Sequence, residues 1–195
     1  MDCQVSMEKC MIGGSKGEDA VNVKRGSVQL VDCVFEEGED DLVDIDRSTG
    51  AIRGCTFTGR TGGDSTSVNG DGLDASGSHL LVQDCLFVGL RDKGLSIGES
   101  SQVFSKDCTF RNNGLAIAVK DLSVAHADGN AFVGNRIVFG VYQKKPVFGG
   151  GLLTVYKNSF EGNGKEREVD SLSKIVSSEK VEEKVEKAFS LTKSQ

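Results

Sequence analysis

Residues 80–119, LLVQDCLFVGLRDKGLSIGESSQVFSKDCTFRNNGLAIAV, contain two copies of one pattern. In each copy an alternating apolar run leads to a cysteine, a C-x-F triplet follows, and a second apolar run comes after a glycine. The cysteine position recurs about every 22 residues, with two insertions, and a period of this length predicts stacked coils. Its members are Cys10, Cys33, Cys55, Cys85 and Cys108, continued by Asn130 and Asn158.

Each repeat predicts three short strands. Alternating apolar residues such as Val28 and Leu30 precede the cysteine, C-x-F marks a second strand, and pairs such as Leu95 and Ile97 mark a third. Three such strands cannot close a core alone, but coils stacked about 4.8 Å apart form parallel sheets around one. The sequence therefore predicts an all-β parallel solenoid.

These repeats resemble the right-handed parallel β-helix of the pectin-lyase-like superfamily, over roughly residues 3–163. The C-x-F and N-x-F turns, with Gly134-Asn135 and Gly162-Asn163 after them, are similar to the generic repeat of that superfamily. The middle of the chain is similar to bacterial surface β-helix modules, some attached to spore-coat-H-type domains. The resemblance implies a right-handed β-helix of about seven coils, which we assign to residues 1–163, and it implies no settled activity.

Residues 164–195 differ from the repeats. Apolar residues at helical spacing among Lys and Glu, from Val169 to Phe189, predict an amphipathic helical tail. We expect it to cap the open carboxyl end, with partner binding as the alternative. Because Met1 enters the first coil almost directly and an uncovered end is an aggregation template, we expect further domains of a longer chain or another cover there.

The composition excludes several classes of protein. The net charge of −6 argues against a nucleic-acid partner. No apolar run reaches membrane-spanning length, and the first residues do not form a signal peptide, so membrane insertion is not expected. The location stays open, with the extracellular space or cell envelope favoured if the chain is a fragment.

The cysteines are expected to be a buried ladder of free thiols, since parallel side chains are poorly placed for bridges and no C-x2-C zinc motif occurs.

The third strands should share one outer face. Counting from the cysteine column puts two rows of outward residues in register. One row is Asn22, Asp44, Asp74, Ser96, Ala118 and Gly140, and the next is Lys24, Asp46, Ser76, Gly98, Lys120 and Tyr142. Asp71, Asp92 and Lys93 stand at one rim, and Glu99, Asp121 and Lys144 at the other. The insertions after Phe57 and at residues 143–151 would wall this face.

Three functions fit this face. As an enzyme, it would be a polysaccharide lyase with Lys93 or Lys120 as base and Tyr142 nearby, or a hydrolase using Asp71 and Asp74. The D-G-L-D run at Asp71 is similar to the D-G-x-D of polygalacturonases. As a binding module, it would hold a glycan without catalysing a reaction on it. As a structural or adhesive solenoid, its charges would form cross-coil pairs of small worth.

We therefore predict a surface or envelope-associated module that binds carbohydrate, with processing left open. The catalytic candidates are Lys93, Lys120 and Tyr142, and the ligand-binding candidates are Asp71, Asp74, Ser96, Glu99, Asp121 and Lys144. No metal ligands are assigned. The acidic run at residues 36–41, with Asp44 and Asp46, has the chemistry to gather Ca²⁺, but it lacks EF-hand spacing, so a solubilising turn is favoured.

Overall fold

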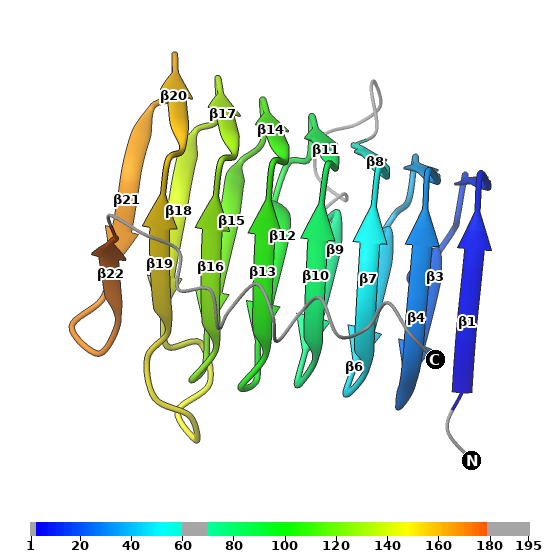
Figure 1. The fold of residues 1–195 in the computed structure, drawn as a ribbon, viewed down its shortest axis with the longest axis horizontal. Coiled ribbons are helices and arrows are strands. Elements are labelled where there is room, and N and C mark those ends of the chain that lie inside the picture. Colours follow the sequence, from blue (N-terminus) through cyan, green and yellow to red (C-terminus); the bar gives the residue numbers. More distant parts are fainter. Residues whose placement is uncertain (1–2, 60–69, 179–195) are drawn as a thin grey trace.

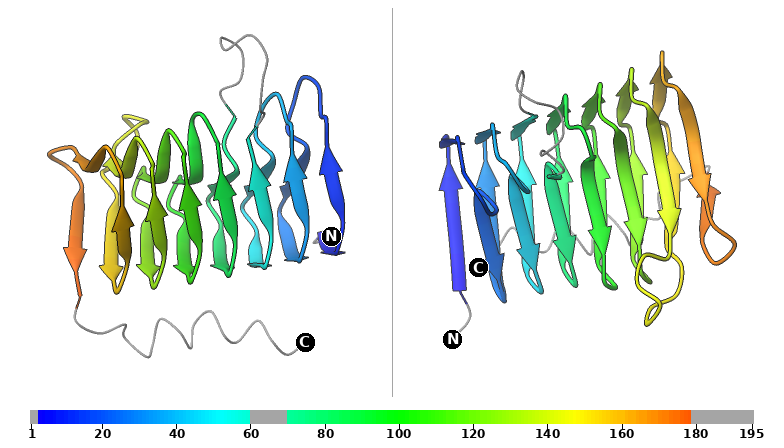
Figure 2. Two further views of the ribbon diagram at one scale, coloured as in Figure 1. Left: turned by 90° about the horizontal axis from the view of Figure 1, so that it is seen from above. Right: turned by 180° about the vertical axis from the view of Figure 1, so that it is seen from behind.

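The computed structural model describes residues 3–59 and 70–178, and every strand in these ranges belongs to one of three parallel sheets. The chain visits the sheets in turn, so that each coil adds one strand to each sheet (Figures 1 and 2). The predicted parallel β-helix of about seven coils is confirmed.

The three sheets are named A, B and C in the order in which the chain reaches them. Sheet A contains β1 (Cys3–Glu8), β4 (Gly26–Val31), β7 (Thr49–Arg53), β10 (His79–Gln83), β13 (Gln102–Lys106), β16 (Val124–Asp128), β19 (Leu152–Tyr156) and β22 (Lys174–Ser177). Sheet B contains β2 (Met11–Gly13), β5 (Val34–Glu36), β8 (Thr56–Thr58), β11 (Leu86–Val88), β14 (Thr109–Arg111), β17 (Ala131–Val133) and β20 (Ser159–Glu161). Sheet C contains β3 (Val21–Lys24), β6 (Val43–Asp46), β9 (Leu73–Ser76), β12 (Lys93–Gly98), β15 (Leu115–Lys120), β18 (Ile137–Tyr142) and β21 (Lys165–Val169).

The core is a column of stacked side chains along the solenoid axis. The phenylalanine of each C-x-F or N-x-F triplet stacks on the next, and the rings of Phe57, Phe87 and Phe110 lie 4.6 and 4.8 Å apart, centroid to centroid. Apolar residues of sheets A and C, such as Leu80 and Leu95, fill the rest of the interior. Identical positions stack because every coil has the same register.

The turn between sheets A and B carries the cysteine column. All six cysteines lie in the described ranges and are free, and Cys33, Cys55, Cys85 and Cys108 are buried. Each of these four thiols donates to the carbonyl two residues earlier. Where asparagine replaces cysteine at Asn130, its Oδ1 accepts from the Cys108 amide at 2.8 Å, so the amide ladder continues the column.

The other two turns also have polar ladders. Between sheets B and C, Asn113 and Asn135 are buried, and each donates Nδ2 to the carbonyl of the phenylalanine in the preceding coil, Phe87 and Phe110. Between sheets C and A, serine hydroxyls accept from backbone amides of the coil before, as Ser101 does from Ser78. These bonds satisfy backbone groups that would otherwise be buried without partners.

The prediction of a helical tail from residue 164 is wrong for residues 165–177. Lys165–Val169 and Lys174–Ser177 are strands that pair with β18 and β19. The free edges of those strands offer a complete row of backbone partners, and this outweighs a helical spacing of apolar residues. The rest of the predicted tail, residues 179–195, lies outside the described ranges. Within those ranges no helix is long and apolar enough to cross a membrane.

Candidate functional site

The candidate site is the outer face of sheet C, which we call the C-face. In the long strands of this sheet the alternation of inward and outward side chains breaks near the start, so that two successive residues, such as Ala116 and Ile117, both enter the core. The residue before them, Leu115, then points outward together with Ala118. The C-face therefore has three outward columns where the sequence predicted two.

The register of the two predicted columns agrees with the structure. Asp44, Asp74, Ser96, Ala118 and Gly140 are Cα partners in successive coils, and Lys120 pairs with Tyr142 in the next column. The third column starts at Asp71 and continues with Lys93, Leu115 and Ile137, of which the last three are paired in register. The sequence had placed Asp71 and Lys93 at the rim, because simple alternation does not foresee this break.

Lys93 is the centre of the first charged group. Its Nζ donates to Asp71 Oδ1 at 3.1 Å and also contacts the Asp92 carboxylate. Only 12% of the Lys93 side chain is exposed. Burial lowers the pKa of Lys93, but Asp71 and Asp92 together hold it above its usual value. Lys93 thus stays charged at neutral pH, which favours a role in binding an anion over one as a base.

Lys120 is the centre of the second charged group. Its side chain is 6% exposed and lies over Gly98, where a Cβ would meet Lys120 Cε at 3.4 Å. The Nζ donates to Ser96 Oγ at 2.7 Å and lies 3.7 Å from Asp74 Oδ1. That carboxylate oxygen is buried and has no hydrogen bond within the described residues. A ligand hydroxyl would supply the missing donor.

The amino-terminal part of the C-face is acidic. Burial raises the pKa of Asp41 to about 8, and the neighbouring Asp71 carboxylate adds to the shift. Burial likewise raises the pKa of Asp44 to about 7, with Asp46 adding to it. Burial raises the pKa of Asp71 to about 6 although Lys93 opposes the shift. Carboxyl groups that titrate near neutral pH are typical of functional sites, although ion-pair networks also produce them.

One acidic group has the spacing of a cation site. Asp19, Asp40 and Asp41 each bring a carboxylate oxygen within 4.8 Å of the others. Oxygen ligands of this kind suit Ca²⁺. Exposed carboxylate clusters are also common without a bound ion. The sequence pointed to the run that contains Asp40 and Asp41, but not to Asp19, which joins them from the previous coil.

The part of the C-face that β15 and β18 form is apolar. Leu115, Ala118 and Ile137 form a small buried cluster on the outside of the sheet, and Tyr142 packs against it. A Cβ at Gly140 would meet Leu115 Cδ2 at 2.9 Å and the Tyr142 ring at 3.4 Å, so these side chains lie closely over the glycine. Burial raises the pKa of Tyr142. The phenol therefore stays protonated and can donate a hydrogen bond.

The loop at residues 143–151 walls one edge of the C-face. Asp121 holds this loop, because its Oδ1 accepts from the backbone amides of Lys144 and Lys145 at 2.7 and 2.8 Å. Lys145 reaches back to form an ion pair with Glu99. Asp121 is buried and engaged by the loop, whereas Lys144 is exposed. The first insertion covers residues that lie outside the described ranges.

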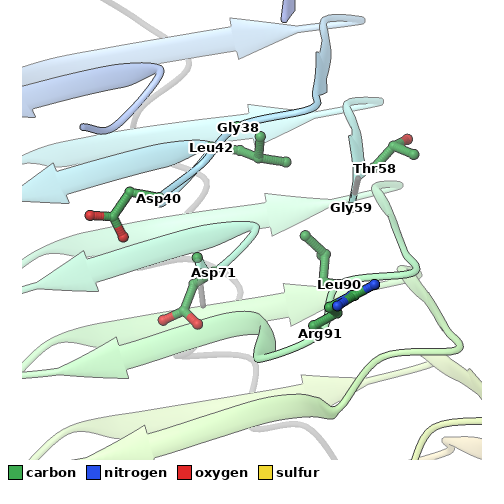
Figure 3. A pocket seen from close by; sticks show the side chains of 9 residues that line it. Gly38, Asp40, Leu42, Thr58, Gly59, Asp71, Leu90 and Arg91 are labelled. Atoms are coloured by element: carbon green, nitrogen blue, oxygen red, sulfur yellow. The ribbon is translucent and has the colours of Figure 1, made fainter. Parts of the chain in front are cut away.

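A small pocket lies beside the start of β9 (Figure 3). Asp40, Asp71 and Arg91 contribute charged groups to its lining, and Leu42 and Leu90 contribute apolar ones. Asp71 thus belongs to both the pocket and the ion pair with Lys93. The sequence gave no signal for Arg91, which lies in the turn before β12.

Stability should fall as the pH rises from about 4 to about 8. The folded pKa values of Asp41, Asp44 and Asp71 exceed the 3.8 expected of an unfolded chain, so their stabilising effect is complete below that value and is lost as each group ionises. Asp41→Asn should stabilise the protein at pH 8 by about 1–2 kcal/mol, since solvent screens part of the effect. Urea denaturation at pH 5 and 8 measures this. Asp84→Asn, in an exposed turn, is the control, and stability that rises with pH would contradict the prediction.

The sequence matches a known family over most of its length. The profile described as "Right handed beta helix region" matches residues 1–164. The A-module of mannuronan C-5 epimerase AlgE4 from Azotobacter vinelandii is similar with a TM-score of 0.45 and 10% identity, covering 88% of this chain and 57% of that one. A catalytic domain of GH87 alpha-1,3-glucanase in complex with tetrasaccharides has a TM-score of 0.30 and 8% identity, covering 82% and 49%.

The chain thus spans about half the length of these two structures. At such identities, what they act on says nothing about what this chain does. No curated protein matches the sequence.

Proposed function

Since the chain belongs to the right-handed β-helix family, whose profile matches residues 1–164, we propose that its C-face binds carbohydrate, as part of a surface or envelope-associated protein. One observation carries the proposal. Asp74 stands in the outward column beside Lys120, and its buried Oδ1 lies 3.7 Å from Lys120 Nζ and has no hydrogen bond among the described residues. A buried acceptor without a partner is costly, and a sugar hydroxyl is a donor of the right kind.

The surroundings of Asp74 suit a sugar chain. Lys93 and Lys120 are held by carboxylates and Ser96, so their positions are fixed before a ligand arrives. Tyr142 is half-buried against the apolar cluster on the following coils, and its ring offers a surface to the C–H groups of a sugar ring. A glycan lying along the solenoid axis would meet polar groups first and the Tyr142 ring next.

Binding is tested with isosteric variants. We expect Asp74→Asn and Tyr142→Phe each to weaken binding to a soluble polysaccharide about 5- to 10-fold, because each removes or weakens one hydrogen bond. Isothermal titration calorimetry against a panel of neutral and uronate polysaccharides measures the Kd. The matched controls, Asp128→Asn and Tyr156→Phe, lie on sheet A. The proposal would be contradicted if the sheet A variants raised the Kd as much as the C-face variants do. It would also be contradicted if no polysaccharide of the panel were bound.

Processing of the bound glycan is a second possibility. A carboxyl group with a pKa of about 6, such as Asp71, is poised to act as a general acid. The same panel is assayed for new reducing ends and for the absorbance of an unsaturated product. A hydrolase would give the first signal and a lyase both, while binding without either would leave a non-catalytic module.

A structural or adhesive solenoid is the alternative function. It is favoured by the ion pairs themselves, since Lys93 already has two carboxylate partners. In that case the C-face would be a set of internal contacts between coils.

A further inference from the structure

A second polar pocket lies on the first coils of the solenoid, where the chain passes from sheet C to sheet A. It is open to solvent and has a volume of about 470 Å³. Residues at the starts of β1, β4 and β7 line it, and these strands are neighbours at one end of sheet A (Figure 1). Its polar side chains are Gln4, Arg25, Ser27, Arg47 and Thr49. None of these belongs to the C-face.

The polar groups of this pocket repeat from one coil to the next. The stretches 25–27 (Arg-Gly-Ser) and 47–49 (Arg-Ser-Thr) occupy equivalent places, because the strands on both sides of them pair in register. Arg25 and Arg47 share the left-handed backbone conformation, with φ of 57° and 46°. Their Cα–Cβ bonds therefore leave the turn in the same direction, about 4.8 Å apart. The pocket thus has one arginine and one hydroxyl group on each of two successive coils.

The two guanidinium groups have no counter-charge in the structure. Both arginines are exposed, and neither side chain has an ion pair or a hydrogen bond within residues 3–59 and 70–178. The neighbouring Lys24, by contrast, is paired with Asp46. The next coil has Gly77 in the place of the arginines, so it brings no acid to them. A Cβ at Gly77 would meet Arg47 Cγ at 3.3 Å, which shows that the Arg47 stem lies against the glycine. Two adjacent unpaired arginines in a chain of net charge −6 offer a place for an anion.

We propose that this pocket binds the tetrahedral oxyanion of a phosphate or sulfate ester. An arginine presents its N–H donors in a fixed fork and holds such groups through paired hydrogen bonds. A planar carboxylate has two oxygens, which one arginine engages fully. A phosphate or sulfate group has a further oxygen for the second arginine. Ser27 and Thr49, which are Cα partners, would donate their hydroxyl groups to the same oxygens. This site can bind its anion whether or not the C-face binds a glycan.

Nuclear magnetic resonance titration of the full chain tests the site. Sodium phosphate and sodium sulfate are added in separate experiments at neutral pH, with sodium chloride holding the ionic strength constant. We expect saturable shifts of the side-chain N–H signals of Arg25 and Arg47, with a Kd on the order of 1 mM. The anion that binds more tightly identifies the ester, and equal binding of the two means that the site accepts either.

Three variants separate a specific site from general attraction of anions. Arg25→Gln and Arg47→Gln should each raise the Kd about 10-fold, because each removes charged hydrogen-bond donors. Arg111→Gln is the matched control and should leave the Kd unchanged. Arg111 is also exposed and unpaired among the described residues, but valines stand beside it in register on both sides.

Four results would overturn the proposal. Chloride alone could produce the same shifts, or acetate could bind as tightly as phosphate and sulfate. The Kd could stay unchanged in Arg25→Gln and Arg47→Gln, or it could rise as much in Arg111→Gln as in those two variants.

Discussion

Replacing Phe87 by alanine is expected to lower the free energy of unfolding by about 3–5 kcal/mol. The ring is fully buried and stacks on Phe57 at 4.6 Å and on Phe110 at 4.8 Å. Its removal would leave a cavity that the neighbouring coils cannot close, because their spacing is fixed by the strand pairing on either side. Urea denaturation followed by circular dichroism measures the change.

The control for this prediction comes from the same stack. Phe160 is the last described ring of the column and is 46% exposed. Phe160→Ala should therefore cost about 1 kcal/mol, because little of its surface is removed from water. Similar losses for the two variants would show that the stack does not act as the continuous core that its geometry suggests.

Replacing Lys93 by methionine is expected to destabilise the protein by about 2–4 kcal/mol at pH 8. The change keeps the length of the side chain but leaves the buried Asp71 carboxylate without its cation. The Asp92 side chain is 42% exposed and stays hydrated, so the loss comes mainly from Asp71. The penalty should shrink at pH 5, because Asp71 can then take up a proton. Thermal and urea denaturation at the two pH values measure this.

A double variant identifies the cause of the stability lost in Lys93→Met. Adding Asp71→Asn to Lys93→Met removes the unpaired charge and should recover at least half of the lost stability. Failure to recover, together with a loss that does not depend on pH, would mean that the Lys93 side chain contributes through packing alone.

Much of the fold could be predicted from the sequence, because a repeat fixes register. The cysteine column at Cys85 and Cys108 placed Ser96 beside Ala118, and the structure pairs them. The prediction failed where local pattern and tertiary contact differ. Val169 and Ile175 have helical spacing, yet their segments are strands, because the edges of β18 and β19 were available for pairing.

The candidate site was less predictable than the fold. Counting residues from the cysteine column placed Asp74, Lys120 and Tyr142 on one face, and their roles in binding remain predictions. Sequence reasoning pointed to the acidic run that contains Asp41 but missed its contact with Asp71, whose backbone amide donates to the Asp41 side chain across the insertion. It also missed the Asn113–Asn135 ladder and the small apolar cluster of sheet A that contains Phe104, since neither belongs to the pattern of inward apolar residues that defined the repeat.

The sequence by itself determined the period, the three strands of each coil and which residues stack, because equal spacing along the chain becomes vertical alignment once the coils stack in register. Only the tertiary structure decided which charges meet and how deeply they lie. Lys120 is buried because Gly98 leaves room beneath it and Ser96 Oγ accepts a hydrogen bond from its Nζ. Lys93 stays charged because two carboxylates from different coils converge on it. Such contacts depend on breaks in the strand alternation, on turns and on side-chain reach, and the spacing of residues along the chain does not encode these.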